Sequence, residues 1–330
     1  MNPHGIDVAP FRFSTEDLPE QDRVAIFREE FGRTQCRVDI EPLPDIAFRS
    51  NLTIHQFPGV AISSHVGGGY RGWRTPDLLS DARDEYSLVI NLKRPSVIAQ
   101  RGREFVIDEQ AATLLTLAET GGIIRPTLDH HLRVLQMPRA AIAPLVRHAE
   151  DAIMRPIPRE SEALRLLNDY VALLQNSDVL QEAALRTLVA GHIHDLVAAT
   201  IGATRDAMEA ARGGGIRAAR LATIRADVLA NLSDAHLSAK TVGLRHGVSD
   251  RYVHLLFAET GQTFSRFVEE QRLQRAFALL THPTRAIPRI GLIAAAVGFA
   301  EHSTFDRAFR RRFGDTPSGV RRSRANQEVD

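Results

Sequence analysis

The fold of the C-terminal part of this chain is decided by residues 289–322, RIGLIAAAVGFAEHSTFDRAFRRRFGDTPSGVRR. The apolar residues between Ile290 and Ala294 follow the i, i+3, i+4 spacing of a helix with one buried face. Gly298 ends that period, as a residue free to adopt positive φ does at a helix end. A second period follows, with arginines on its outer face and an inner face formed by Phe305, Phe309 and Phe313. Two helices joined in this way are typical of a helix-turn-helix.

The same pattern occurs earlier in the chain, in residues 237–263. Gly247 and Gly261 correspond to Gly298 and Gly314, and the corresponding glycines lie 51 residues (247 to 298) and 53 residues (261 to 314) apart. The helix-turn-helix is therefore duplicated. The residues between the copies predict one amphipathic helix, whose apolar face consists of Phe264, Phe267, Val268, Leu273, Ala276, Phe277 and Leu280.

These motifs resemble those of a known family. The sequence reads I-x-x-I-A-x-x-x-G-F at Ile290–Phe299, F-x-x-x-F-x-x-x-F-G at Phe305–Gly314, and then Thr316-Pro317. With this spacing, about residues 216–324, a third of the chain, are similar to the DNA-binding domain of AraC/XylS-type transcription regulators. The resemblance implies sequence-specific binding to double-stranded DNA and a cupin-like sensor domain ahead of the helices.

Two positions depart from the family pattern. Members of the family often carry arginine after the position of His254, where this chain has Leu255. The second recognition helix of the family often begins with a serine or aspartate cap, whereas Ala300 and Glu301 stand here, and neither caps a helix as well.

The residues expected to face DNA follow from the helical period. Side chains near the start of a recognition helix reach the base edges first, and those opposite the apolar face are Asp250, Arg251, His254 and Leu255 in the first copy and His302, Ser303, Asp306 and Arg307 in the second. Arg251 matches the acceptors of guanine and Leu255 the methyl group of thymine. Arg310 and Arg311 are expected to contact phosphates. The alternative for each position is a solvated surface, and for the two aspartates a local role at the helix is favoured over base contact.

Charge divides the chain in the same way. The formal net charge is +1, but residues 213–330 hold 18 basic and 11 acidic side chains, whereas residues 1–212 hold 23 and 29. A basic block joined to an acidic block indicates a nucleic-acid-binding half and a half with another role. Gly213, Gly214 and Gly215 end an expected flexible linker over residues 201–215.

The N-terminal half has a different period. Between residues 38 and 137 apolar residues alternate with polar ones, as at Leu52 and Ile54, and glycines at 67–69 and 121–122 indicate turns. Several short strands of this kind predict a small barrel or sandwich. Together with the resemblance, this predicts an α+β protein in which a cupin-like β-barrel with flanking helices precedes an all-α domain with two helix-turn-helix motifs.

Helical periods flank the predicted barrel. One helix is expected over residues 19–32, with Gly32 just past its end, and three more over residues 140–153, 161–174 and 179–200. The last two have apolar stripes that either pack on the barrel or form a dimer interface. The expected domains are therefore residues 1–200 for sensing or dimerisation, 201–215 as linker and 216–325 for DNA binding.

Few residues of the N-terminal half are candidates for a ligand-binding, metal or catalytic site. Tyr70, Arg71, Trp73 and Arg74 combine aromatic and cationic groups and are candidates for binding an acidic effector, with surface packing as the alternative. No metal, cofactor or catalytic site is expected: the adjacent His130 and His131 would point to opposite faces of a strand. Cys36, the single cysteine, is expected to be a packed thiol.

These patterns predict a transcription regulator. Activation is favoured over repression because the resemblance implies it: activators are the commoner type in that family. Two other classes stay open: an enzyme with a DNA-binding tail, and an architectural DNA-binding protein whose N-terminal half only dimerises. An apolar cavity in the N-terminal half would favour sensing. The expected partners are DNA, RNA polymerase, a small-molecule effector and a second copy of the chain. The absence of a leader-like segment and of a long apolar run predicts a cytoplasmic protein.

Overall fold

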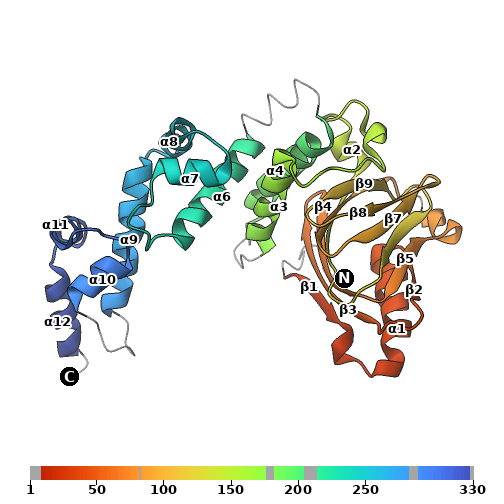
Figure 1. The fold of residues 1–330 in the computed structure, drawn as a ribbon, viewed down its shortest axis with the longest axis horizontal. Helices are drawn as coiled ribbons and strands as arrows, with labels where there is room; N and C mark the ends of the chain where they lie inside the picture. The colour runs from red at the N-terminus through yellow and green to blue at the C-terminus, as the bar shows by residue number, and fades with distance from the viewer. Residues whose placement is uncertain (1–8, 82, 176–181, 204–213, 282–288, 328–330) are drawn as a thin grey trace. The chain divides into compact units, whose positions relative to one another are not determined.

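The computed structural model describes residues 9–81, 83–175, 182–203, 214–281 and 289–327. Its contacts divide the chain into two compact units, residues 1–219 and 220–330 (Figure 1). The boundary lies inside helix α6 (Gly215–Ala230), and residues 204–213 of the expected linker lie outside the described residues. No described helix is long and apolar enough to cross a bilayer.

The N-terminal unit contains two separate antiparallel sheets rather than one closed barrel. The first has the strand order β1-β3-β4-β11-β6-β9 and the second the order β2-β5-β10-β7-β8. The α+β class and the sheet-rich domain ahead of the helices are therefore confirmed, while closure of the barrel is not. The strands are β1 (Phe11–Ser14), β2 (Asp39–Pro42), β3 (Arg49–Phe57), β4 (Val60–Gly68), β5 (Tyr70–Arg74), β6 (Glu85–Lys93), β7 (Ser96–Gln100), β8 (Arg103–Ile107), β9 (Ala112–Thr116), β10 (Gly121–Arg125) and β11 (His131–Pro138).

Two pairs of glycines expected in turns lie in strands instead. Gly67 and Gly68 end β4, so only Gly69 lies between β4 and β5. Gly121 and Gly122 begin β10, which pairs with β5 on one side and with β7 on the other. A Cβ atom on Gly122 would lie 2.0 Å from the carbonyl oxygen of Gly72 in β5. The prediction of a turn was wrong because glycine also occurs where two backbones approach too closely for a side chain.

The first helical segment is longer than expected. A short helix α1 (Arg23–Ile26) continues into a π-helical segment, η3 (Phe27–Cys36), and the chain leaves it at Arg37 with a φ of 55°. Gly32 therefore lies within the helical segment and not after it. A Cβ atom on Gly32 would lie 2.8 Å from the carbonyl oxygen of Val38, so the glycine permits close packing of the following chain.

The helix expected over residues 140–153 does not form as one element. The structure has α2 (Arg139–Ile142) and a single turn, η5 (Ala149–Ala152). The next residues bind the edge strand β9, because the amides of Met154 and Ile157 donate hydrogen bonds of 2.9 and 2.8 Å to carbonyls of that strand. Sheet pairing there replaces the helical hydrogen bonds. The last two predicted helices are present as α3 (Glu162–Gln175) and α4 (Ala183–Ile201).

The expected apolar stripe of α4 is only partly buried. Val189 and Leu196 are buried, whereas Leu185 is 43% and Leu188 is 55% exposed. The predicted residues 179–181 at its start lie outside the described residues. Packing on its own domain therefore accounts for part of the stripe, and dimerisation stays a prediction.

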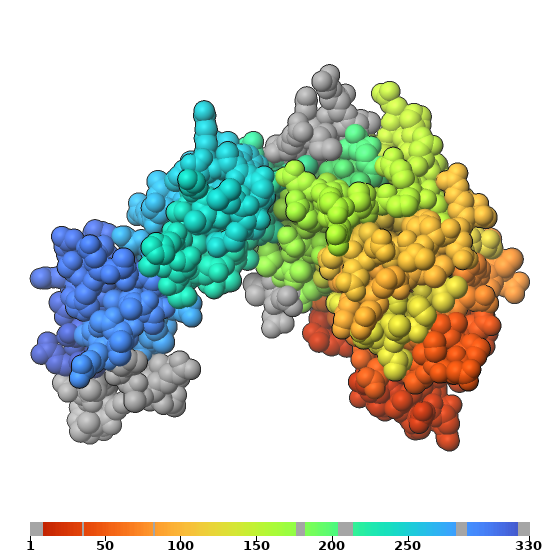
Figure 2. Space-filling view, in the orientation of Figure 1, coloured from red at the N-terminus to blue at the C-terminus, as the bar shows by residue number. Residues whose placement is uncertain are grey.

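The C-terminal unit is all helical and has two hydrophobic cores. Buried residues of α6, α7 and α8 pack with Phe264, Phe267 and Val268 of α9 to form the first core, and Leu273, Ala276 and Leu280 of α9 pack with α10 and α11 in the second. The two parts of the unit run from cyan to blue in Figure 2. The helices after α6 are α7 (Ala239–His246), α8 (Asp250–Ala258), α9 (Phe264–Thr281), α10 (Ile290–Ala296), α11 (His302–Phe313) and α12 (Pro317–Gln327).

All four glycines of the duplicated pattern have the backbone conformation that the sequence predicts. The φ angles of Gly247, Gly261, Gly298 and Gly314 are 65°, 78°, 92° and 77°. Gly298 has a second constraint, since a Cβ atom there would lie 2.2 Å from the carbonyl oxygen of Leu232. The turn between α10 and α11 therefore needs glycine for both conformation and space.

Candidate nucleic-acid interface and ligand cavity

The first candidate recognition helix, α8, begins with a good cap. The hydroxyl oxygen of Ser249 accepts a hydrogen bond of 3.2 Å from the amide of Tyr252, which satisfies one of the free amides of the first turn. Val253, Leu256 and Phe257 are fully buried in the first core. Their burial turns the opposite face of α8 outward, with four exposed residues of the predicted set: Asp250, Arg251, His254 and Leu255.

Two of these outward residues have local partners. The carboxylate of Asp250 accepts a hydrogen bond of 2.8 Å from the amide of Arg251, which stabilises the first turn, as expected for an aspartate at a helix start. The ring of His254 lies 6.3 Å from that of Phe264 in an edge-on arrangement. Arg251 itself is exposed, and Leu255 is 48% exposed.

The second candidate recognition helix, α11, has the same inward face but a weaker start. Phe305 and Phe309 have no exposed surface, and His302, Ser303 and Arg307 are exposed on the other side. Glu301 at the cap position makes no side-chain hydrogen bond to the helix backbone, in agreement with the poor cap expected from the sequence. Asp306 is half-buried.

A contact between two side chains organises the outer face of α11. The Nδ1 atom of His302 lies 3.2 Å from a carboxylate oxygen of Asp306, one helical turn later. This contact is consistent with a local role for Asp306 rather than base contact. Because both side chains are substantially exposed, an approaching phosphate or base can displace the pair at little cost.

The arginines at the end of α11 differ in their partners. Arg311 forms an ion pair of 2.7 Å with Glu269, and Arg312 one of 2.8 Å with Glu270. Both carboxylates belong to α9, so these pairs join the second recognition helix to the helix that links the two motifs. Arg310 is exposed. A phosphate contact by Arg311 would therefore have to compete with Glu269, an exchange that costs little for an exposed pair.

The N-terminal unit contains a cavity of about 100 Å³. Both sheets contribute to its wall, with Ser63 and Val89 from the first sheet and Gly72 and Gln100 from the second. The wall combines aliphatic side chains with a few buried polar groups, as small-molecule sites commonly do. Among the described residues, no group of three or more His, Cys, Asp or Glu side chains is placed to hold a metal ion.

The four proposed effector residues do not share one face of their strand. Alternation along β5 buries Tyr70 and Arg74 and leaves Arg71 and Trp73 half-buried on the other side. Only Arg74 of the four lines the cavity. Arg71 pairs with Glu41 and lies over the ring of Trp73, its guanidinium carbon 5.4 Å from the ring centroid. An effector contact by all four at once is therefore inconsistent with the pleat of the strand.

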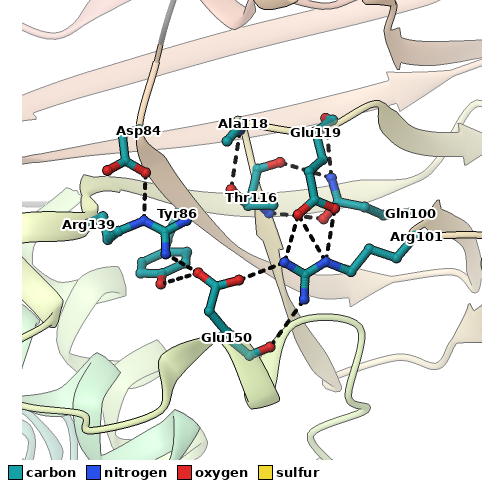
Figure 3. Close-up of polar contacts among 9 residues, drawn as sticks. All are labelled: Asp84, Tyr86, Gln100, Arg101, Thr116, Ala118, Glu119, Arg139 and Glu150. Carbon is teal, nitrogen blue, oxygen red and sulfur yellow. Dashed lines mark hydrogen bonds and ion pairs between the residues drawn. The ribbon is translucent and has the colours of Figure 1, made fainter.

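A network of ion pairs borders the cavity (Figure 3). Arg101 contacts Glu119 at 2.7 Å and Glu150 at 2.6 Å, and Glu150 also accepts hydrogen bonds from Tyr86 and Arg139. Burial and the hydrogen bond to Glu150 raise the pKa of Tyr86 to about 12, so its hydroxyl donates at neutral pH. The network joins the segment after β11 to the strands, and it engages Glu119 at the cavity wall.

Comparisons with known proteins agree with this arrangement. A family described as an AraC-binding-like domain matches residues 27–202, and one described as a helix-turn-helix domain matches residues 244–323. The first match alone covers more than half of the chain. The chain belongs to the AraC family of transcription regulators. The resemblance read from the glycine and aromatic spacing is thereby confirmed.

Relatives of this AraC-family protein include proteins that are named as transcriptional activators. The transcriptional activator RhrA of Rhizobium meliloti (strain 1021) is 30% identical over 71% of this chain and 70% of its own length. The transcriptional activator NphR of a Rhodococcus species is 23% identical over 89% of this chain and 87% of its own length. Among solved structures, the AraC-like transcriptional activator CuxR aligns with a TM-score of 0.48 and 18% identity, over 82% of this chain and 96% of that chain.

Sequence reasoning found the outward face of both recognition helices but missed the cavity. Its buried polar residues include Ser63, His65, Gln100 and Arg125. The available signal was the placement of polar residues at inward positions of otherwise apolar strands, as Ser63 and His65 are in β4. That signal is weak without the strand pairing, because an inward and an outward position look alike in a short strand.

The assignment of a base contact to Arg307 and a phosphate contact to Arg311 can be tested with two substitutions. We expect Arg307→Ala to reduce the preference for the specific site by about 1–3 kcal/mol, because a lost base contact affects one sequence only. We expect Arg311→Ala to weaken binding to all sequences alike, since a phosphate contact is present on any duplex. The measurement is the dissociation constant on specific and on random DNA at one salt concentration. An equal loss on both duplexes for both variants would contradict the assignment.

Proposed function

We propose that this AraC-family protein is a sequence-specific activator of transcription, controlled by a small molecule in its N-terminal unit. The observation that carries the proposal is the duplicated helix-turn-helix on one shared helix, with a row of exposed polar residues on each outer face. The names of the two relatives, both transcriptional activators, support activation. Activation implies contact with RNA polymerase, and the site of action would be the cytoplasm.

We propose further that α8 and α11 enter successive major grooves. The linking helix α9 has 18 residues and is therefore about 27 Å long at 1.5 Å per residue, a length of the same order as the roughly 34 Å turn of B-DNA. Phe257 of α8 packs against Phe264 near the start of α9, and Phe313 of α11 packs against Phe277 near its end. These contacts would hold the two reading helices at separate points along the duplex.

A footprint of the full-length protein on its operator tests this proposal. One chain should protect two short elements about one helical turn apart on the same face of the duplex. Affinity should fall steeply with salt, because Arg310 and Arg311 would neutralise phosphates and release the counterions condensed on them. Protection of a single short element, or an affinity independent of salt, would contradict two-groove binding.

The cavity favours sensing over a purely architectural role. A protein whose N-terminal half only dimerised would have no need of a space lined by both sheets, and filling it with side chains would increase stability. The exposed Leu185 and Leu188 of α4 would suit a contact with a second copy, and sensing and dimerisation are compatible. Analytical ultracentrifugation of the full-length protein, with and without DNA, measures whether it is a monomer or a dimer.

A further inference from the structure

A buried cation without an anionic partner lies on the cavity wall. Arg125, the last residue of β10, is 7% exposed and lines the cavity. Its Nε and Nη1 atoms donate to no acceptor, and it forms no ion pair with a described carboxylate. Its guanidinium carbon lies 4.1 Å from the centroid of the Tyr70 ring, a cation–π contact that compensates only part of the lost hydration.

The other charged groups of the wall are already neutralised. Arg74 pairs with Asp81 at 2.5 Å, and Glu119 pairs with Arg101 at 2.7 Å. Neither carboxylate is therefore available to Arg125. The cavity has one unpaired positive charge among its lining residues, all of which are described.

The weak acids near Arg125 stay protonated at neutral pH. Burial raises the pKa of the Cys36 thiol to about 11, against a smaller opposing effect of Arg125 and Arg83. Burial also raises the pKa of the Tyr70 hydroxyl, although the charge of Arg125 and hydrogen bonding with Ser50 and Arg125 oppose the shift. Neither group supplies a negative charge. The charge of Arg125 therefore has no negative counterpart among the residues that the structure describes.

The rest of the cavity suits a small molecule with an apolar body. Val89, Leu115 and Leu132 contribute aliphatic surface, and the polar atoms Nδ1 of His65 and Oγ of Ser87 have no partner. Burial, with smaller effects of Arg125 and His131, holds the pKa of His65 well below its ordinary value, so the ring is neutral. A space of about 100 Å³ holds about seven to ten non-hydrogen atoms, since one water needs roughly 10–15 Å³ of it.

We infer that the effector of this protein is a small organic carboxylate whose anionic group binds Arg125. The inference rests on the proposed sensing function and specifies its ligand. Arginine presents several donors in the plane that a carboxylate matches, and the anion would pair a charge that is otherwise buried alone. The apolar remainder of the ligand would fill the space between the two sheets, with His65 and Ser87 available to a second polar group.

Calorimetric titration of the full-length protein tests the inference with propionate, hexanoate and benzoate, each compared with its uncharged amide. We expect at least one acid to bind and its amide to bind at least about tenfold more weakly, because a hydrogen-bonded ion pair to buried arginine is lost. Arg125→Gln should weaken binding of that acid by roughly ten- to a hundredfold. The matched control is Arg103→Gln, which changes an exposed arginine of β8 that does not line this cavity.

Three results would overturn the inference: no binding of any of the acids, equal binding of acid and amide, or an equal loss in the two variants. If Arg125→Gln does not fold, the comparison of acid with amide in the unaltered protein still shows whether the cavity requires an anionic group. Failure of the inferred ligand class can be distinguished from failure of the proposed DNA-binding function. Carboxylate binding by a protein that binds no operator would refute the proposed regulator alone, whereas operator binding without carboxylate binding would refute the ligand class alone.

Discussion

Replacing Arg74 with methionine is expected to lower the free energy of unfolding of the N-terminal unit by about 3 kcal/mol, in the range for breaking a buried ion pair. Arg74 is 2% exposed and donates to the carbonyl oxygens of Leu117 and Arg37 as well as to Asp81. Methionine fills much of the volume but leaves these acceptors without their donor. Asp81 keeps a hydrogen bond of 3.2 Å from the backbone amide of Arg83, and the nearest remaining guanidinium groups are those of Arg37 and Arg83, at 3.8 and 3.9 Å.

The single tryptophan provides the measurement. Trp73 lies in β5, so its fluorescence during urea unfolding reports on the N-terminal unit. Arg71→Met is the matched control: Arg71 lies in the same strand and pairs with Glu41 at the surface, and an exposed pair contributes about 0–1 kcal/mol. Equal losses for Arg71→Met and Arg74→Met would contradict the structural role assigned to Arg74.

The cost of the Arg74 substitution should also depend on pH. Burial alone would raise the pKa of Asp81, but the hydrogen bond and charge of Arg74, with Arg83, lower it below its ordinary value. A carboxylate with a lowered folded pKa stabilises the protein above the unfolded pKa of about 3.9. That contribution is lost as the pH falls through the folded value. The difference between unaltered protein and variant should therefore shrink below about pH 4.

Gly298→Ala is expected to destabilise the C-terminal unit by about 2–4 kcal/mol. About 1–2 kcal/mol comes from placing a side chain at positive φ, and the remainder from overlap of the new Cβ with the carbonyl oxygen of Leu232, 2.2 Å away, since overpacking costs about 1–3 kcal/mol. The turn between α10 and α11 would shift or open. Binding to the operator should be lost along with stability, because α11 starts four residues after Gly298.

Gly261→Ala is the matched control, because it separates the conformational cost of a side chain at positive φ from the steric cost of the new Cβ atom. Gly261 has a φ of 78°, but a Cβ atom there would meet nothing within 4 Å, so only the conformational cost of about 1–2 kcal/mol is expected. Urea unfolding followed by circular dichroism at 222 nm reports on the helices, while the Trp73 transition should stay unchanged in both variants. If Gly298→Ala lowers the free energy of unfolding no more than Gly261→Ala does, the backbone around Leu232 must move freely to accommodate the new Cβ atom.

The helix-turn-helix unit was predictable because its determinants are local. The spacing of Phe305 and Phe309 defines the buried face of α11 within one helix, and Gly298 and Gly314 mark its ends within a few residues. Local signals of this kind do not depend on which distant segment the helix contacts. The exposed positions of Arg251, His302 and Arg307 followed directly from the buried ones. Their contacts with DNA stay predictions.

The N-terminal unit was predictable only in outline. Alternation revealed strands such as β3 and β6, but not β5 and β10. Both of these strands contain glycines, and those of β10 replace side chains because neighbouring backbones approach closely. The segment 140–153 has a helical pattern, yet the following residues pair with β9 and end the helix early. Competition between local propensity and a distant strand edge is decided by the whole fold.

The sequence by itself determined the family, the duplicated reading helices and the division into a basic and an acidic half, because periodicity, glycine spacing and charge act between neighbours in the chain. Only the tertiary structure decided which polar side chains meet. Arg125, His65 and Cys36 lie far apart in the sequence and reach one cavity because β10 and β4 belong to different sheets that face it. Pairing order and register place them there, and neither is encoded in any short stretch of residues.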